Sequence, residues 1–166
     1  MPENLRDLFD NFHQKGTIEW IGLRPDKKAI LNSVDHAEVV VGKGLQGDHY
    51  KGTSNNRDVT LIQAEHLQAV GQILGRSVTP DLTRRNIVVS GVNLLSLENK
   101  NFKLGDDVTL EMTGLCHPCS RMEENLGYGG YNAMRGHGGI TARVITGGKI
   151  KVGDQLEVLN TLVNRT

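Results

Sequence analysis

The fold of this chain is decided by Phe102-Lys103-Leu104-Gly105-Asp106-Asp107-Val108-Thr109-Leu110-Glu111, a stretch with an echo in Ile150-Lys151-Val152-Gly153-Asp154-Gln155-Leu156-Glu157-Val158-Leu159. Each copy places a Gly-Asp turn before a strand in which apolar and polar residues alternate. This alternation is typical of a strand that packs one face against a core. Two copies are too few for a repeat protein. Because such turns are common in small closed barrels, the pair predicts a β-barrel.

Other short strand patterns occur along the chain, at 17–22, 37–41, 59–62, 86–90 and 140–145. Strands and helices do not alternate regularly, as they would in a doubly wound parallel sheet. No linker or second domain is visible in the pattern. We therefore predict one domain over residues 1–166, mostly β with peripheral helices (α+β), with its core at about 16–160.

Two helices are predicted beside these strands. The longer covers 63–74 and ends at Gly75, a residue type that often terminates helices. Its apolar face is formed by Leu67, Val70 and Leu74. The shorter is an amphipathic N-terminal helix at 3–14, whose apolar residues are Leu5, Leu8, Phe9 and Phe12.

The composition excludes several classes of protein. Lys and Arg together number 19, as do Asp and Glu, so the chain lacks the basic excess of a dedicated nucleic-acid binder. Hydrophobic residues make up 37% and charged residues 23%, which is typical of a globular domain. No apolar run is long enough to span a membrane, and no secretory signal is visible. The sequence has only two cysteines, which points to a reducing compartment when no secretory signal is present. We therefore expect a cytoplasmic protein.

The segment Cys116-His117-Pro118-Cys119 carries the most chemistry, and four interpretations compete. The cysteines can be small buried residues. They can close a zinc site with His49 and His137, although the spacing does not demand it. They can exchange thiols and disulfides, but that motif normally opens a helix in an α/β fold. Finally, one thiolate can ligate a soft metal or carry sulfur, with nearby cations from Arg121 and 83–86.

Several stretches in order resemble the MOSC family, the domain at the C-terminus of molybdenum cofactor sulfurases. It also occurs in the mitochondrial amidoxime reducing component and in small free-standing bacterial proteins, the branch that fits best. The likeness covers roughly residues 16–160. The matching stretches are Gly44-Leu45-Gln46-Gly47-Asp48-His49, Asp58-Val59-Thr60-Leu61-Ile62-Gln63, Arg84-Arg85-Asn86-Ile87-Val88-Val89-Ser90-Gly91, Leu104-Gly105-Asp106, Cys116-His117-Pro118-Cys119, Gly138-Gly139-Ile140-Thr141-Ala142-Arg143-Val144 and Gly153-Asp154.

The resemblance implies a molybdenum cofactor (molybdopterin) held by residues from distant parts of the chain. In amidoxime-reducing members the second cysteine of the pair ligates the metal, and that position here is Cys119. The arginine and asparagine of the same members correspond to Arg84 and Asn86. A guanidinium can grip a phosphate with two hydrogen bonds, and an amide suits the edge of a pterin.

Further candidate cofactor-binding residues surround these three. A glycine-rich loop can approach an anion with its backbone amides. The family's usual Gly-Asp-x-His spacing is altered at Gly47-Asp48-His49, so whether the histidine faces a pocket is left open. The additional candidates are His49, Arg121, Gly136, His137, Gly138 and Gly139.

The bacterial branch implies a reductase of N-hydroxylated compounds with a Cys-ligated molybdenum centre. The sequence holds neither four cysteines for an iron–sulfur cluster nor a Gly-x-Gly-x-x-Gly fingerprint, so electrons must come from a partner protein. The alternative is a non-enzymatic sulfur carrier. It would accept sulfur from a cysteine desulfurase, a pyridoxal phosphate-dependent partner, and deliver it for maturation of the metal cofactor.

Overall fold

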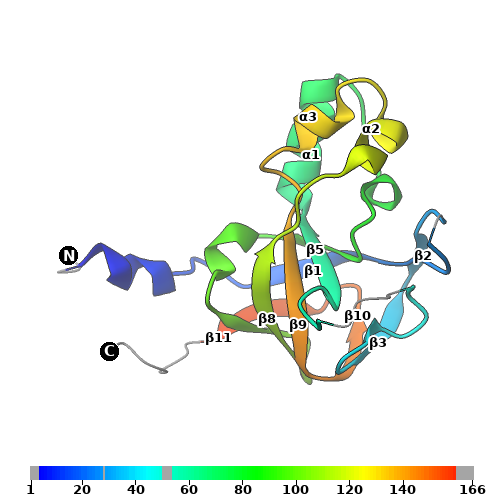
Figure 1. Cartoon of the computed structure of the whole chain (residues 1–166). Helices are drawn as coiled ribbons and strands as arrows, with labels where there is room; N and C mark the ends of the chain where they lie inside the picture. Colours follow the sequence, from blue (N-terminus) through cyan, green and yellow to red (C-terminus); the bar gives the residue numbers. More distant parts are fainter. Residues whose placement is uncertain (1–3, 28, 50–53, 160–166) are drawn as a thin grey trace.

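A computed structural model describes residues 4–27, 29–49 and 54–159 (Figure 1). The strands of this part of the chain are β1 (Gly16–Leu23), β2 (Asn32–Val34), β3 (His36–Val40), β4 (Gly44–Leu45), β5 (Val59–Gln63), β6 (Ile87–Ser90), β7 (Asn101–Leu104), β8 (Val108–Leu115), β9 (Ile140–Thr146), β10 (Gly148–Lys151) and β11 (Gln155–Leu159). The α-helices are α1 (Ala64–Leu74), α2 (Ser120–Leu126) and α3 (Gly130–Met134). Short 3-10 helices are η1 (Leu5–Asp10), η2 (Pro80–Thr83) and η3 (Leu94–Leu97).

Seven of the described strands close into a barrel in the order β11-β7-β8-β9-β5-β6-β1, and β11 pairs with β1 to complete the ring. Strand β2 extends the sheet beyond β1. The pair β5–β6 is parallel, with α1 in the connection between its strands, whereas the other pairs are antiparallel. This arrangement confirms the prediction of a closed barrel, mostly β, with helices at its periphery.

The two echoing stretches contribute differently to this barrel. In the first copy, β7 and β8 form a hairpin around Gly105, whose φ of +63° favours glycine. In the second copy, β11 enters the barrel beside β7, but β10 leaves it and pairs with β3 in a separate sheet. A Cβ atom on Gly105 would lie 2.7 Å from a carboxylate oxygen of Asp154, so the two Gly-Asp turns are in contact.

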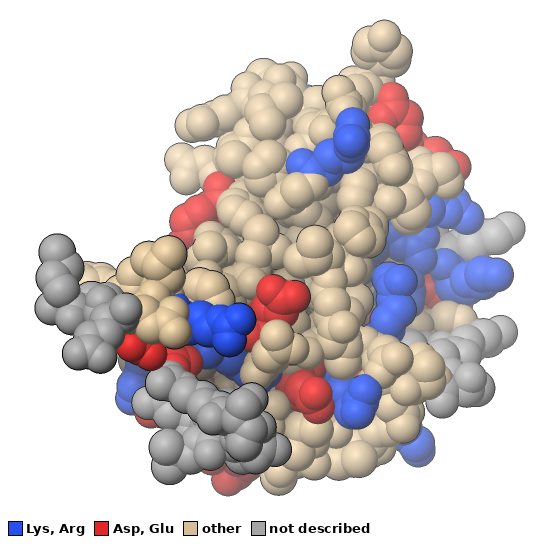
Figure 2. Space-filling view, turned by 60° about the vertical axis from the view of Figure 1, so that its left-hand side comes forward, with Lys and Arg blue, Asp and Glu red and all other residues tan. Residues whose placement is uncertain are grey.

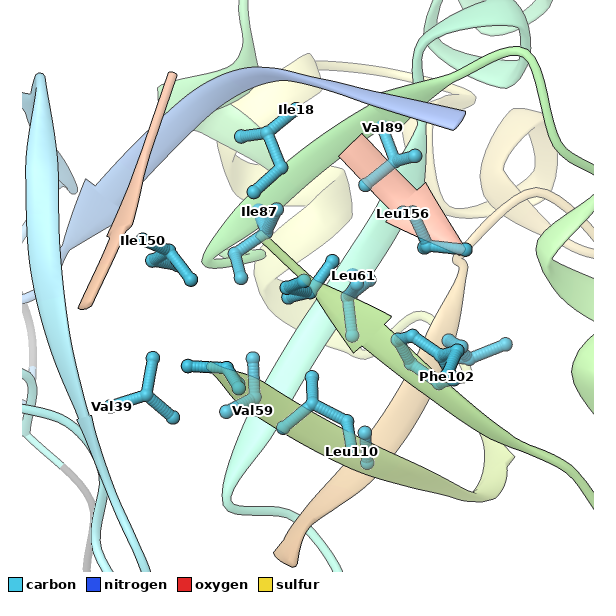
Figure 3. Packing of buried hydrophobic residues seen from close by; sticks show 14 of the residues in the cluster. Ile18, Val39, Val59, Leu61, Ile87, Val89, Phe102, Leu110, Ile150 and Leu156 are labelled. Carbon is cyan, nitrogen blue, oxygen red and sulfur yellow. The ribbon is translucent and has the colours of Figure 1, made fainter. Parts of the chain in front are cut away.

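The barrel interior is filled by aliphatic side chains together with Met112 and Phe102. The labelled side chains point toward one another from facing strands (Figure 3). Burying each such side chain contributes about 1.5–3 kcal/mol relative to leaving it exposed. A second apolar cluster joins α1, α2 and α3 to the outer face of the barrel. Its members include Ile62, Leu67, Val70, Met122 and Met134. The three helices lie together at the top of Figure 1.

Helix α1 confirms the predicted helix, since it spans Ala64–Leu74 and ends at Gly75 with a φ of +71°. The N-terminal helix is shorter than expected and differs in type. It is a 3-10 helix over Leu5–Asp10, and part of the expected 3–14 range lies outside the described residues. Leu5 and Phe9 are 77% and 67% exposed, so this segment lacks the tertiary packing that stabilises a longer helix. Across the described residues, no helix has the length and apolarity needed to cross a membrane.

Candidate functional site

A pocket of about 420 Å³ lies where the barrel meets the helices, and it contains both cysteines. Its walls come from segments that are far apart in the sequence. The described residues that line it are Arg24, Leu31, Asp48, Arg57, Asp58, Thr60, Arg84, Arg85, Asn86, Cys116, His117, Pro118 and Cys119. We call it the Cys119 pocket. Of the candidate residues named from the sequence, Cys119, Arg84 and Asn86 belong to this lining.

Arg85 holds the inner wall of the pocket together. Its side chain is only 5% exposed and donates to backbone carbonyl oxygens in three different segments. Nε donates to Gly138 at 2.8 Å, Nη1 donates to Thr83 at 2.9 Å, and Nη2 donates to Cys116 and His117 at 3.2 and 3.3 Å. Burial lowers the pKa of Arg85, while the nearby cysteines act in the opposite sense. An arginine nonetheless stays protonated in proteins, so the charge here is permanent.

Asn86 is also buried, and its side chain is used within the fold. Its Oδ1 accepts hydrogen bonds from the backbone N–H and the hydroxyl of Thr60, at 3.3 and 3.2 Å. Its Nδ2 donates to the carbonyl oxygen of Gly22 at 3.2 Å. These bonds tie β6 to β5 and β1 directly under the pocket. Any contact with a ligand would therefore use the remaining hydrogen-bonding capacity of the amide.

Arg84 stands at the open side of the pocket. Its backbone has a φ of +61°, a conformation that is uncommon for a residue with a side chain. Its Nη2 donates to the carbonyl oxygen of Lys27 at 3.4 Å, and no other side-chain hydrogen bond of Arg84 to the described residues is seen. Burial lowers the pKa of Arg84, as do Arg24, Arg121 and Arg85, whereas Cys119 raises it. These opposing effects arise because Arg84 lies within electrostatic range of both the thiol and the other guanidinium groups.

The two cysteines occupy opposite environments. Cys119 is exposed and immediately precedes α2, whereas Cys116 is 2% exposed. The Sγ of Cys116 accepts a hydrogen bond from Nη2 of Arg57 at 3.8 Å. Cys119 is therefore the thiol that a molecule in the pocket can reach.

Two buried polar atoms in the pocket lining have no hydrogen-bond partner among the described residues: Oδ1 of Asp58 and Nε of Arg24. The other oxygen of Asp58 accepts a hydrogen bond from the backbone N–H of Val144 at 3.1 Å. Burial raises the pKa of Asp58, against the lowering effects of that hydrogen bond and of Arg143. Buried polar groups are normally satisfied, so these two atoms mark places where a ligand or water completes the pocket.

The remaining candidate residues lie outside the lining of the Cys119 pocket. Arg121 forms an ion pair with Glu124 at 3.0 Å on the surface of α2. Nη2 of Arg24 donates to the backbone carbonyl of His49 at 2.8 Å. Gly136 borders a neighbouring pocket.

The glycine-rich loop approaches protein backbone in its second half. A Cβ atom on Gly138 would overlap the carbonyl oxygen of Cys116, and one on Gly139 would overlap that of Leu61. Nδ1 of His137 lies 3.0 Å from the carbonyl oxygen of Ala133, and its ring packs edge-on against His66. The close approach of Gly138 and Gly139 to these two carbonyl oxygens accounts for glycine at both positions without a ligand.

Three residues that line the pocket were not among the candidates predicted from the sequence: Arg24, Arg57 and Asp58. Each stands just outside a strand, where the chain reaches the end of the barrel: Arg24 follows β1, and Asp58 precedes β5. Charged residues directly beside an apolar strand were the available signal. Lys and Arg side chains gather along the right-hand side of the molecule in Figure 2, whereas Asp and Glu are scattered. The balanced net charge therefore conceals an uneven distribution.

The geometry does not assemble a zinc site. Within the described residues, no three His, Cys, Asp or Glu side chains come together in a way that could hold a metal ion. The grouping of both cysteines with His49 and His137 is thus absent. A metal at Cys119 would need to bring its other ligands with it.

Comparison with known structures supports the fold. The YUAD protein from Bacillus subtilis superposes with a TM-score of 0.76 over 87% of this chain and 96% of that one, at 19% identity. YiiM from Geobacillus stearothermophilus gives 0.73, with 90% and 77% covered at 17% identity. YiiM from Escherichia coli gives 0.69, with 91% and 72% covered at 16% identity.

Comparison of sequences addresses the family. No curated protein sequence matches this chain. A family model does match, over residues 48–157, and its description is MOSC domain. This match runs from the aspartate at the edge of the Cys119 pocket to the last strand of the barrel. Since it takes in well over half of the sequence, and the barrel agrees with it, the chain belongs to the MOSC domain family.

Proposed function

We propose that this protein binds a molybdenum–pterin cofactor in the Cys119 pocket and reduces N-hydroxylated compounds. The MOSC family is associated with molybdenum cofactor proteins. The observation that carries the proposal is the exposed thiol of Cys119 in a pocket lined by Arg24, Arg57, Arg84 and Arg85. A thiolate is a soft ligand and suits a soft metal centre. Arginines suit the phosphate of the cofactor.

The residues present fit such a cofactor. Oδ1 of Asp58 and Nε of Arg24 are buried and have no hydrogen-bond partner among the described residues, so the pocket lining holds an unsatisfied acceptor and an unsatisfied donor that suit a polar heterocycle. Arg84 offers the phosphate a guanidinium at the open side. Arg85 cannot turn toward a ligand without breaking its bonds to the protein, so its contribution is a fixed positive charge beneath the pocket.

The proposed reaction converts R–NH–OH, two protons and two electrons into R–NH₂ and water. When bound, the cofactor would supply the exchange of two electrons. The protein would bind and orient the cofactor in the cavity of about 420 Å³. Electrons come from a partner protein. We place this activity in the cytoplasm, because free cysteines persist in a reducing compartment.

The test compares two serine variants in protein made by a host that synthesises the cofactor. We expect Cys119→Ser to lose nearly all bound molybdenum and reductase activity, because the metal loses its only cysteine ligand. Cys116→Ser is the matched control, and it should retain most of both, because Cys116 is buried beside Arg57. Elemental analysis and turnover of an N-hydroxylated substrate measure the outcome. Equal losses in the two variants would contradict the proposal.

The exposure of Cys119 also suits a second function, the transfer of sulfur from a cysteine desulfurase. In that case the purified protein carries a persulfide on Cys119 that cyanide removes, and it holds no stoichiometric molybdenum. Mass spectrometry before and after cyanide treatment distinguishes the two functions. Stoichiometric molybdenum without a persulfide supports the reductase.

A further inference from the structure

A second pocket, of about 500 Å³, adjoins the Cys119 pocket. Its described lining consists of His117, Pro118, Tyr131, Arg135 and Gly136. His117 and Pro118 line both pockets, so only the short turn that leads into Cys119 separates them. Cys119 directly follows Pro118 in the chain, so the second pocket borders the segment that carries the reactive thiol. None of the functions above uses this space.

The outer wall of the second pocket belongs to α3 and the residue after it. Ala133 and Met134 face inward and are buried in the helical cluster. Tyr131 and Arg135 are four residues apart, a spacing that places side chains on the same face of a helix. Both are exposed, and α2 and α3 lie together at the top of Figure 1. The wall thus presents an aromatic ring and a guanidinium side by side.

This wall is held in place from behind. The carboxylate of Glu123 on α2 accepts hydrogen bonds from the backbone N–H groups of Gly129 and Tyr131, at 2.7 and 2.9 Å. The side chains of Tyr131 and Arg135 form no hydrogen bond or ion pair that we observe with the described residues. Next to them, a Cβ atom on Gly136 would meet nothing within 4 Å. The backbone is fixed while the functional groups point into open space.

We propose that this second pocket is the substrate subsite, and that it selects planar aromatic compounds bearing a carboxylate. This proposal rests on the reductase function above, which it makes more specific. Tyr131 and Pro118 offer flat apolar faces on which an aromatic ring stacks. Arg135 matches a carboxylate with two parallel hydrogen bonds. Because the wall is exposed, the subsite suits a molecule that enters and leaves in each turnover, rather than a retained cofactor.

The experiment uses two substrates that differ only in charge, benzamidoxime and 4-carboxybenzamidoxime. The full-length protein with its cofactor should prefer the carboxylate in kcat/KM. We expect Arg135→Gln to reduce the ratio of the two values about tenfold, since a charge-assisted pair is lost. Tyr131→Leu should raise KM for both substrates. The matched control is Arg6→Gln, an exposed arginine on η1 outside both pockets, and it should leave the ratio unchanged.

A binding measurement separates this proposal from the reductase function. Calorimetry with 4-carboxybenzamidoxime and protein lacking cofactor should show binding that Arg135→Gln weakens about tenfold. If that binding is found but neither substrate is reduced, the subsite stands and the reductase function fails. If benzamidoxime is reduced but Arg135→Gln changes neither the ratio nor the binding, the subsite proposal is overturned. Binding of a nucleoside monophosphate in preference to the carboxylate probe overturns it too, in favour of a cofactor extension.

Discussion

The Cys119 pocket has an inner wall and an open side, and the same residue types behave differently in the two. On the inner wall, Arg85 and Cys116 are buried, and every hydrogen bond seen from the Arg85 side chain to the described residues goes to a backbone carbonyl oxygen. On the open side, Arg84 and Cys119 are accessible, and Arg84 has a single long hydrogen bond to the protein. Arg84 and Arg85 are adjacent in sequence, yet one stabilises the fold and the other is available to a ligand.

The difference arises from the backbone. Arg84 is the left-handed residue that ends η2, while Arg85 leads into the extended strand β6. The turn between them sends the two side chains in different directions. A non-glycine residue with positive φ carries a backbone cost of about 1 kcal/mol, and such residues cluster at functional sites. At Arg84 this conformation ends η2, and it separates the direction of the Arg84 side chain from that of Arg85.

The largest effect should follow from removing the inner arginine. Arg85→Met keeps much of the side-chain volume but deprives four carbonyl oxygens of their donors. We expect a loss of about 3–5 kcal/mol in the free energy of unfolding, because buried partners of a lost charge stay desolvated and unpaired. Denaturation in urea, followed by circular dichroism, measures it. Arg85→Lys keeps the charge but not the fork of donors, and should lose less.

If the Arg85→Met variant were as stable as the wild type, Arg85 would not stabilise the fold, and the two sides of the pocket would not differ in the way described. The same experiment on the isosteric Leu61→Met substitution in the barrel core provides a reference. A volume-conserving apolar exchange there costs less than about 1.5 kcal/mol. The inner arginine should therefore matter more than a change in the apolar core.

The barrel was predictable because alternation of apolar residues has a direct structural meaning. The strands at 17–22, 59–62 and 86–90 appear in the structure close to the expected bounds, since each buries a face in the barrel. The strands at 59–62 and 86–90 also bury residues of their outer face beneath the helices. The N-terminal helix was predicted to be too long because Leu5 and Phe9 have helical spacing, whereas both side chains are largely exposed in the structure. Periodicity shows that a face is apolar, and tertiary contacts decide whether that face is buried.

The candidate site was predictable only in part. Cys119, Arg84 and Asn86 came from the family resemblance, and the structure brings them to one pocket. The environment of each residue could not be read from the chain, because it depends on segments far away. Thr60, for example, satisfies Asn86 from 26 residues away. Asp58 belongs to a stretch that carries the family resemblance, but the sequence does not show that one of its oxygens is buried without a partner among the described residues.

A smaller effect, confined to binding, should follow from changing the open arginine. Arg84→Gly removes the guanidinium and suits the positive φ, so stability should change by less than about 1 kcal/mol. Retention of cofactor should fall about tenfold, because a charge-assisted contact to phosphate is lost. Molybdenum and pterin content per protein, measured after the same dialysis, give the ratio. Arg84→Lys is the control that keeps the charge, and its retention should lie between the two.

Should Arg84→Gly lose as much stability as Arg85→Met while its cofactor content is unchanged, the open side would be structural as well. Unfolding curves of the two variants at the same pH decide this. The comparison is clean because the substitutions are one residue apart and alter the same functional group.

The smallest effect concerns Asp58, which is buried in the inner wall and has one oxygen without a hydrogen-bond partner in the described part of the chain. Since burial raises its pKa above the unfolded value, the folded state holds the proton more tightly and loses stability as pH rises through this interval. Asp58→Asn cannot ionise, yet its carbonyl oxygen still accepts from Val144. The stability of this variant relative to the wild type should therefore increase from pH 4 to pH 8, as measured by urea denaturation without cofactor. A difference that is independent of pH would mean that Asp58 is solvated like a surface carboxylate, and the pocket would then have no buried acceptor to offer a ligand.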